Sequence, residues 1–248
     1  MYKKLFFAIF LAFLSCSVFA DYYQFMPDND LWKYDRINKD NNDSERAMFD
    51  KIIQIAKSVY DPIAQANNET LTINANWDDP TVNANTSRFW GSVTINMYGG
   101  LFRRPEISYE GFVFVLCHEI GHAWGGEPYI NSWNKLAAEG QADYYGAKDC
   151  AKKVLPILNL TKYKFPPTQF MINTCNNNNL CLRELVAGQA LGILLSVLKS
   201  EPIPNYETPD TTIVEETELS YPAHVQCRLD TYFNGTMNLD RPKCWFKN

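Results

Sequence analysis

Two histidines four residues apart are the strongest chemical signal in this sequence. His118 and His122 stand in an H-E-x-x-H segment, and the chain holds three histidines in all. On an α-helix, residues four apart lie on one face, so both imidazoles can point at one metal ion. Zinc accepts neutral histidine nitrogens, and Glu119 would lie beside that ion, where it can take a proton from a water that the metal activates. The segment therefore predicts a zinc site with Glu119 as the general base.

A catalytic zinc site usually has three protein ligands, so the two histidines need an acidic partner. Three carboxylates follow His122 within reach, namely Glu127, Glu139 and Asp143. Glu127 comes directly after a glycine pair and could reach back only through a tight loop. Glu139 and Asp143 share one face of a second predicted helix, and Gly140 is expected to let the two helices approach closely. One carboxylate could bind the metal while the other holds a histidine by its far ring nitrogen.

The order of these residues resembles the gluzincin metallopeptidases. In that group, an H-E-x-x-H helix is followed by a glutamate ligand and, four residues later, by an aspartate. The resemblance implies that Glu139 is the third zinc ligand and that Asp143 supports His118. It also implies a zincin-like domain of the minimal gluzincin type. Another zincin group uses an aspartate as the third ligand, in a pattern that residues 140–146 partly match, and that pattern would favour Asp143 instead.

The chain is also distantly similar to the family of HtpX and the CAAX prenyl proteases. A predicted strand and Gly99-Gly100-Leu101 precede the histidine helix, and Tyr221-Pro222 with Arg228 stands where that family has a His-Pro pair and an arginine. The similarity covers residues 89–149 and, weakly, residues 221–230. The chain departs from that family in two ways. The family's glutamate usually follows the second histidine by much more than the 17 residues found here, and its members are usually embedded in membranes.

Hydrolysis of an amide also needs a group that stabilises the negative charge on the carbonyl oxygen. A hydrogen-bond donor beside the metal commonly does this. The candidate donors are Tyr221, His224, Arg228 and Tyr144. The similarity in order favours Tyr221. For the others a structural role is the simpler interpretation, since arginines pair with acids such as Asp230 and a lone histidine is often a surface residue.

Periodic apolar residues predict a single α+β domain with few strands early and several helices later. The helices are expected at residues 44–60, 107–124, 132–150, 182–198 and 222–233. The first should end at Asp61-Pro62, because proline disfavours a helical residue before it. Strands are expected at 71–75 and 89–97. Residues 92–98 are expected at an edge of the sheet, where an extended peptide or protein substrate could pair with them.

The first twenty residues have the pattern of a secretory signal peptide. Two lysines precede an apolar run at residues 5–14, and Val18-Phe19-Ala20 provides a small-residue exit. Residues 21–248 would then form the mature zinc metallopeptidase domain, exported to the periplasm or secreted. Lipid anchoring through Cys16 is the alternative, although the preceding residues fit a lipobox poorly. No later segment is expected to cross a membrane, since residues 185–198 come closest and are too short.

Cysteine content and charge agree with export and exclude one class of partner. Six cysteines remain after residue 20, which predicts disulfide bonds in an oxidising compartment. Cys227 and Cys244 are the expected pair, while Cys117, inside the histidine helix, is a candidate for a buried free thiol. The 23 basic and 28 acidic residues give a net charge of −5, without a basic run. Nucleic acid is therefore not expected as a partner.

The sequence predicts an exported zinc-dependent endopeptidase. His118, His122 and Glu139 would bind Zn²⁺, Glu119 would accept a proton from water, and Tyr221 would stabilise the carbonyl oxygen. Two alternatives remain open. The chain could be a zinc-stabilised binding or interaction protein on a peptidase fold without turnover, or a hydrolase of cell-wall peptides. Glu119 argues against a binding protein, because a structural zinc site needs no general base.

Overall fold

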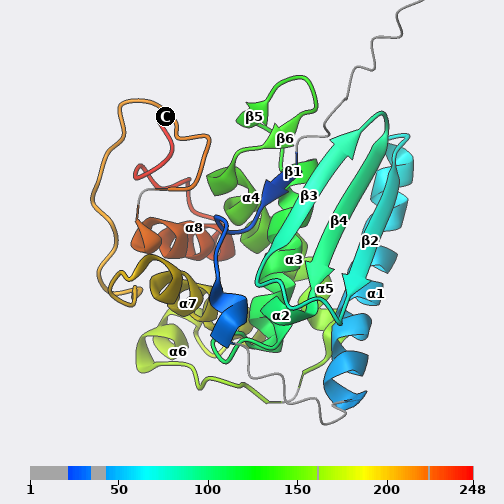
Figure 1. Cartoon of the computed structure of the whole chain (residues 1–248). Helices are drawn as coiled ribbons and strands as arrows, with labels where there is room; N and C mark the ends of the chain where they lie inside the picture. Colours follow the sequence, from blue (N-terminus) through cyan, green and yellow to red (C-terminus); the bar gives the residue numbers. More distant parts are fainter. Residues whose placement is uncertain (1–21, 35–42, 161, 223, 248) are drawn as a thin grey trace, which may run out of the picture.

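The computed structural model describes residues 22–34, 43–160, 162–222 and 224–247. The predicted signal peptide, with Cys16, lies outside the described residues. Within them the chain has the expected α+β architecture, in which helices pack on one face of a small mixed sheet while the other face is open (Figure 1). Helix α1 runs along the covered face beside β2, and α3 lies behind β3.

The main sheet has the strand order β1-β3-β4-β2. Strand β2 is parallel to β4, and β3 is antiparallel to both β4 and β1. A separate hairpin, β5–β6, stands at the end of α3. The strands are β1 (Tyr22–Gln24), β2 (Thr70–Asn76), β3 (Ala84–Phe89), β4 (Ser92–Tyr98), β5 (Tyr129–Asn131) and β6 (Leu136–Ala137).

Two predictions about the strands are wrong. Residues 89–97 are not one strand but contain the turn of the β3–β4 hairpin, because Phe89 pairs with Ser92 across a turn in which Trp90 and Gly91 both have positive φ angles, 45° and 77°. Two-residue hairpin turns with both central φ angles positive fit the right-handed twist of paired strands. Strand β4 is consequently internal, between β3 and β2, so it cannot accept a peptide as an edge.

The predicted metal-binding segment lies on α3, which packs mainly against α4, α7 and η2. The helices are η1 (Leu31–Tyr34), α1 (Asp43–Ala66), α2 (Gly99–Phe102), α3 (Tyr109–Trp124), α4 (Glu139–Tyr145), η2 (Gly146–Cys150), α5 (Ala151–Leu158), α6 (Gln169–Cys175), α7 (Asn179–Lys199) and α8 (Val225–Met237). Helix α3 begins as predicted, with the Ser108 side chain accepting a hydrogen bond from the Gly111 N–H at 3.0 Å. This cap satisfies one of the free amides at the helix start.

Helix α1 does not end at Asp61-Pro62 but continues through Pro62 to Ala66. The stripe of buried residues that begins at Phe49 continues through Tyr60 to Ala64. Pro62 itself is exposed and faces away from this stripe. Burial of the last turn therefore offsets a proline cost of roughly 3 kcal/mol in a helix interior.

The predicted helix at 132–150 begins only at Glu139. The preceding residues form the β5–β6 turn, because two side chains bond their own backbone. The Asn131 carboxamide accepts from the Trp133 N–H at 2.9 Å, and the Asn134 carboxamide accepts from the Leu136 N–H at 3.3 Å. Such local bonds compete with helical ones and favour turns. The last helix likewise begins at Val225, three residues after the predicted start.

Among the described helices, α7 is second in length to α1 and is much more apolar. By length and composition, Asn179–Lys199 could cross a membrane, contrary to the expectation that this region is too short. In the fold, 72% of its most apolar window is buried, as in the core helix of a globular protein. Its apolar surface is covered mainly by α3 and α8.

Three disulfides join the six described cysteines: Cys117–Cys150, Cys175–Cys181 and Cys227–Cys244. The expected Cys227–Cys244 pair is confirmed, and disulfides in this number are consistent with an oxidising, exported environment. The prediction of a free thiol at Cys117 is wrong. A Cβ at Gly146 would lie 3.2 Å from the α3 backbone, so η2 packs tightly on α3 and brings Cys150 to Cys117.

We expect the Cys117–Cys150 bond to stabilise the fold more than the bond between Cys175 and Cys181. The first closes a loop of 33 residues and the second one of six. Loop-closure entropy predicts a loss of about 3–4 kcal/mol on replacing the first pair by alanine, and about 2 kcal/mol for the second. Urea unfolding of the two double variants measures the difference. Equal losses would contradict the dominance of the longer loop.

A buried carboxyl on α7 should make stability depend on pH. Glu184 is 1% exposed, and burial raises its pKa to about 8 although Lys152 acts in the opposite direction. The folded state therefore holds this proton more tightly than the unfolded state, so its contribution to stability is lost as pH rises from about 4.5 to 8. The loss is at most about 1.4 kcal/mol per pH unit.

We expect Glu184→Gln to be more stable than the wild type at pH 8 and to flatten this dependence. Urea unfolding of both proteins at pH 5 and pH 8 measures it. If the difference between variant and wild type were the same at both pH values, the carboxyl would already be ionised in the folded protein.

Candidate metal centre

Helix α3 carries His118, Glu119 and His122 into the interior, where all three side chains are fully buried. Their helix is covered by β3 on one side and by α4 and α7 on others. Polar groups in such a place cost free energy unless they are hydrogen-bonded or bind an ion. The partners of each ring nitrogen and carboxylate oxygen therefore define what the site can hold.

The Nδ1 atom of each imidazole is engaged on the side away from the centre. His118 Nδ1 lies 2.6 Å from Asp143 Oδ1 on α4, and His122 Nδ1 lies 2.8 Å from the Ala137 carbonyl oxygen on β6. A carbonyl only accepts, so His122 donates from Nδ1 and its Nε2 carries a lone pair. Bonds of this kind fix the ring orientation of metal-binding histidines.

The Nε2 atoms meet the carboxylate of Glu139. Glu139 Oε2 lies 3.4 Å from His118 Nε2, and Oε1 lies 3.5 Å from His122 Nε2. All three ligand atoms lie within 4.8 Å of one another. His118 Nε2, His122 Nε2 and Glu139 Oε2 are buried without a hydrogen-bond partner among the described residues. Three converging ligand atoms without such a partner fit a bound metal ion, with two nitrogen ligands and one carboxylate oxygen.

Close packing of α3 and α4 brings Glu139 to the histidines. A Cβ at Gly121 would lie 2.6 Å from the Ala142 carbonyl oxygen, so only glycine permits this contact. The expectation that Gly140 serves this purpose is wrong, because Gly140 faces Trp245, and a Cβ there would lie 2.3 Å from the indole. The glycine inside the H-E-x-x-H segment therefore sets the distance between the two ligand-bearing helices.

Asp143 stands behind His118 and is bound from three directions. Besides the imidazole, its carboxylate accepts hydrogen bonds from Arg228 Nε at 2.7 Å, from Arg228 Nη2 at 2.8 Å and from the Tyr232 hydroxyl at 2.9 Å. Arg228 and Tyr232 both come from α8. Asp143 therefore holds the His118 ring from the side opposite Glu139.

The electrostatic environments of the two histidines differ. Burial lowers the pKa of His118, but Asp143 and Glu139 outweigh it and raise the pKa to about 9. Burial lowers the pKa of His122 to about 4, in spite of Glu139. Burial opposes ionisation of Asp143, yet Arg228 and His118 hold its pKa well below the usual value. The cluster thus combines one strongly basic imidazole, one neutral imidazole and a permanent negative charge behind them.

Glu119 lies next to the metal-ligand cluster and is bound by Thr86 on β3. The Thr86 hydroxyl lies 2.6 Å from Glu119 Oε2 and 2.9 Å from the Glu119 carbonyl oxygen. Burial raises the pKa of Glu119 to about 8, although the His118 charge and the Thr86 bond oppose it. A carboxyl with this pKa can accept and return a proton near neutral pH.

The remaining predicted residues are spread over different parts of the structure. Glu127 is exposed and is not part of the ligand cluster. Tyr144 donates its hydroxyl to the Leu239 carbonyl at 2.5 Å, and His224 is exposed at the start of α8. Arg228 is fully engaged by Asp143 and by the Phe25 carbonyl. Glu127 is therefore not a candidate ligand in the structure, and the three candidate donors do not donate into the centre.

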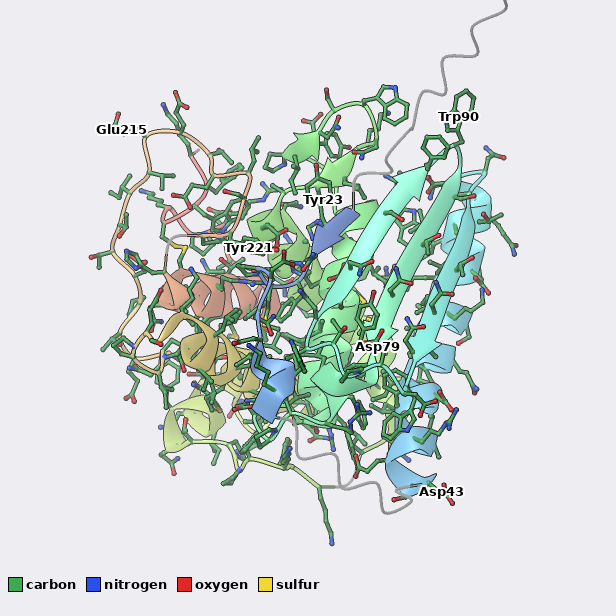
Figure 2. All side chains as sticks on the ribbon, in the orientation of Figure 1. Tyr23, Asp43, Asp79, Trp90, Glu215 and Tyr221 are labelled. Carbon is green, nitrogen blue, oxygen red and sulfur yellow. A yellow bond between two sulfur atoms is a disulfide. The ribbon has the colours of Figure 1, made fainter. Side chains whose placement is uncertain are left out.

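Tyr221 is the candidate donor that does reach the mouth of the centre. It lines a cavity of about 350 Å³ together with Glu139, Ile130 and residues of the N-terminal segment. Burial, together with nearby Glu139, holds the pKa of Tyr221 above its usual value, so its hydroxyl remains a donor. Figure 2 shows Tyr221 beside Tyr23, where β1 passes in front of α4.

Three residues of this site were not predicted from the sequence. Tyr23 and Phe25 lie with their ring centroids 6.1 Å from His122 and 5.2 Å from His118, and Thr86 binds Glu119. Tyr23 lies on β1, Phe25 directly follows it and Thr86 lies on β3, so all three are far from the H-E-x-x-H segment in the chain.

No protein-family model, no curated protein and no solved structure matches this chain.

We expect Glu139 to be a ligand and Asp143 to act through His118. Glu139→Ala should abolish retained zinc, because it removes one of three ligands. Asp143→Asn should weaken zinc binding about 10- to 100-fold, as expected for a group that only orients a ligand. Metal content after dialysis against a graded chelator series measures both, with circular dichroism to confirm folding. A larger loss with Asp143→Asn would overturn the assignment.

Proposed function

We propose that this protein is an exported zinc-dependent endopeptidase of the gluzincin type. The observation that carries the proposal is the convergence of two imidazole nitrogens and a carboxylate oxygen, all buried and without a hydrogen-bond partner among the described residues, with a carboxylic acid beside them and a cavity in front. Two nitrogens and one oxygen suit zinc, which in catalytic sites takes three protein ligands of this kind. When bound, the ion would polarise a substrate carbonyl and lower the pKa of water.

In this proposal Glu119 is the general base and then the general acid. It takes the proton of the attacking water and returns it to the leaving amine, so no covalent bond forms between enzyme and substrate. Thr86 supports this exchange because its hydroxyl holds one carboxylate oxygen and leaves Glu119 Oε1 free of a partner among the described residues. The raised pKa of Glu119, about 8, suits a group that must hold and release a proton in one cycle.

Tyr221 is the proposed donor to the substrate carbonyl. Its hydroxyl already donates to a peptide carbonyl, that of Gln24, at 2.5 Å at the rim of the cavity. A donor placed in advance at the position where charge develops stabilises it without reorganisation. Arg228 has a different task, since it neutralises Asp143 and so maintains the support of His118.

We expect Glu119→Gln to lower the cleavage of an unfolded protein by about 10²- to 10⁴-fold while zinc content stays at one ion per chain. Glutamine keeps the shape and the bond to Thr86 but accepts no proton. Glu139→Ala serves as the control that loses metal and turnover together. Purified cell wall is assayed in parallel, so that a cell-wall peptide hydrolase is recognised.

Equal turnover in the wild type and Glu119→Gln would contradict the role of the base. Full zinc content with no turnover on either substrate would favour a zinc-stabilised binding protein.

A further inference from the structure

The edge of β3 that faces the metal centre is occupied by the chain's own N-terminal strand. Strand β1 pairs antiparallel with β3, with Tyr23 opposite Thr86 and Gln24 opposite Asn85. The pairing continues to Phe25, whose N–H donates to the Ala84 carbonyl at 3.0 Å. Without these residues β3 would be an open sheet edge, which is a template for another extended chain.

The same segment contacts the residues that we assign to catalysis and metal binding. The Tyr221 hydroxyl donates to the Gln24 carbonyl, and the Tyr23 ring lies 6.1 Å from that of the ligand His122. Tyr23 and Gln24 line the cavity that opens on Glu139. Strand β1 is thus a short extended peptide whose Gln24 carbonyl accepts from Tyr221, the proposed carbonyl donor, and whose Tyr23 ring lies near His122, a proposed metal ligand.

Thr86 lies opposite β1 in the sheet and also binds Glu119, the proposed general base. The residue opposite Thr86 in the ladder is Tyr23, and the Thr86 hydroxyl binds Glu119 Oε2 at 2.6 Å. Any extended chain that pairs with β3 in this register therefore brings one residue opposite the anchor of the proposed base. The register of the strand pairing determines which part of that chain lies over the centre.

Burial divides the segment into an anchor and a displaceable part. Phe25 and Met26 are fully buried, and Arg228 donates to the Phe25 carbonyl at 3.0 Å. Tyr23 and Gln24 are only partly buried. Strand β1 has three residues, so its release would break few ladder bonds and leave the core contact of Phe25 in place.

We propose that β1 is an internal occupant of a peptide-binding edge, and that an extended peptide pairs with β3 in its place. The fitting partner is an unfolded or extended segment with an aromatic side chain opposite Thr86, recognised mainly through its backbone. The proposal rests on the proposed function only for the cleavage of that peptide. Displacement of β1 would free the Tyr221 hydroxyl and uncover His122.

Because β1 belongs to the same chain, it competes with any free peptide for the edge of β3 and lowers the apparent affinity for that peptide. A segment held by a short linker competes with an effective concentration in the millimolar range. A free peptide of similar intrinsic affinity therefore binds poorly until β1 is weakened. Long unfolded chains, which offer many extended segments, would compete better than short peptides.

Two variants of the mature chain change the occupancy of the edge in opposite directions. The Phe25 N–H donates to the Ala84 carbonyl, so by the alternation of antiparallel ladders Tyr23 and Thr86 occupy the next hydrogen-bonding position of the ladder. Tyr23→Pro removes the Tyr23 N–H and the ring over His122, and should release β1. Tyr22 and Ser87 face each other in a non-hydrogen-bonded position, where the two Cα atoms lie close enough for a disulfide. The double variant Tyr22→Cys, Ser87→Cys should therefore lock β1 in place.

The probe is a fluorescent peptide with the sequence Asp-Tyr-Tyr-Gln, that of residues 21–24, which leaves out the anchor residues Phe25 and Met26. Its binding is measured by anisotropy on zinc-loaded and metal-free protein, so the readout does not need turnover. Ser87→Cys alone is the control for the lock, and circular dichroism checks the fold of each variant. We expect Tyr23→Pro to bind the peptide at least tenfold more tightly than the wild type, and the locked protein to bind at least tenfold more weakly than Ser87→Cys.

Turnover separates this proposal from the proposed function. If peptide binding shifts as expected but no variant cleaves protein, the binding edge stands and the peptidase function fails. Equal peptide affinity in wild-type, released and locked proteins would overturn the binding edge. So would a folded, zinc-loaded Tyr23→Pro variant that cleaves protein at least tenfold more slowly than the wild type, because β1 would then be a supporting strand of the active site.

Discussion

The carboxylate of Asp143 has no exposure to solvent and so must be neutralised inside the protein. It accepts from the Arg228 guanidinium and the Tyr232 hydroxyl on α8, and it holds the His118 ring on α3. One buried charge therefore joins three helices. Arg228 extends this connection to the N-terminal segment through the Phe25 carbonyl. Removing either Asp143 or Arg228 would leave the other buried without its main charged partner, which is among the costliest defects in a protein core.

The ligand cluster follows from this arrangement. Both imidazoles are held by their Nδ1 atoms, and the two Nε2 atoms are thereby turned to Glu139, without hydrogen-bond partners in the part of the chain that the structure describes. Most buried polar groups in native proteins are hydrogen-bonded, so three converging exceptions mark a place where the fold keeps an interaction open. The tight contact at Gly121 maintains it, because the spacing of α3 and α4 sets the distance between histidines and carboxylate.

The sheet contributes the other half of the site. Thr86 on β3 holds Glu119, while the edge of β3 opposite β4 pairs with β1. The chain's own peptide is thus held against β3 with a carbonyl on Tyr221. Donors that already bind one peptide carbonyl need little rearrangement to bind another. The site therefore combines a closely packed helical half, which carries the candidate ligands, with a strand edge that is paired with a short and only partly buried strand.

Local patterns in the sequence were enough for the α+β class, the start of α3 and the histidine pair, because helical spacing and capping act within a few residues. They also placed Glu139 and Asp143 together on α4. Tertiary structure alone decided which carboxylate meets the Nε2 atoms, since that depends on the contact of Gly121 with Ala142. It also decided that β4 is internal, that Cys117 is bonded and that β1 covers the centre. Each of these depends on segments distant in the chain, whose pairing no local propensity specifies.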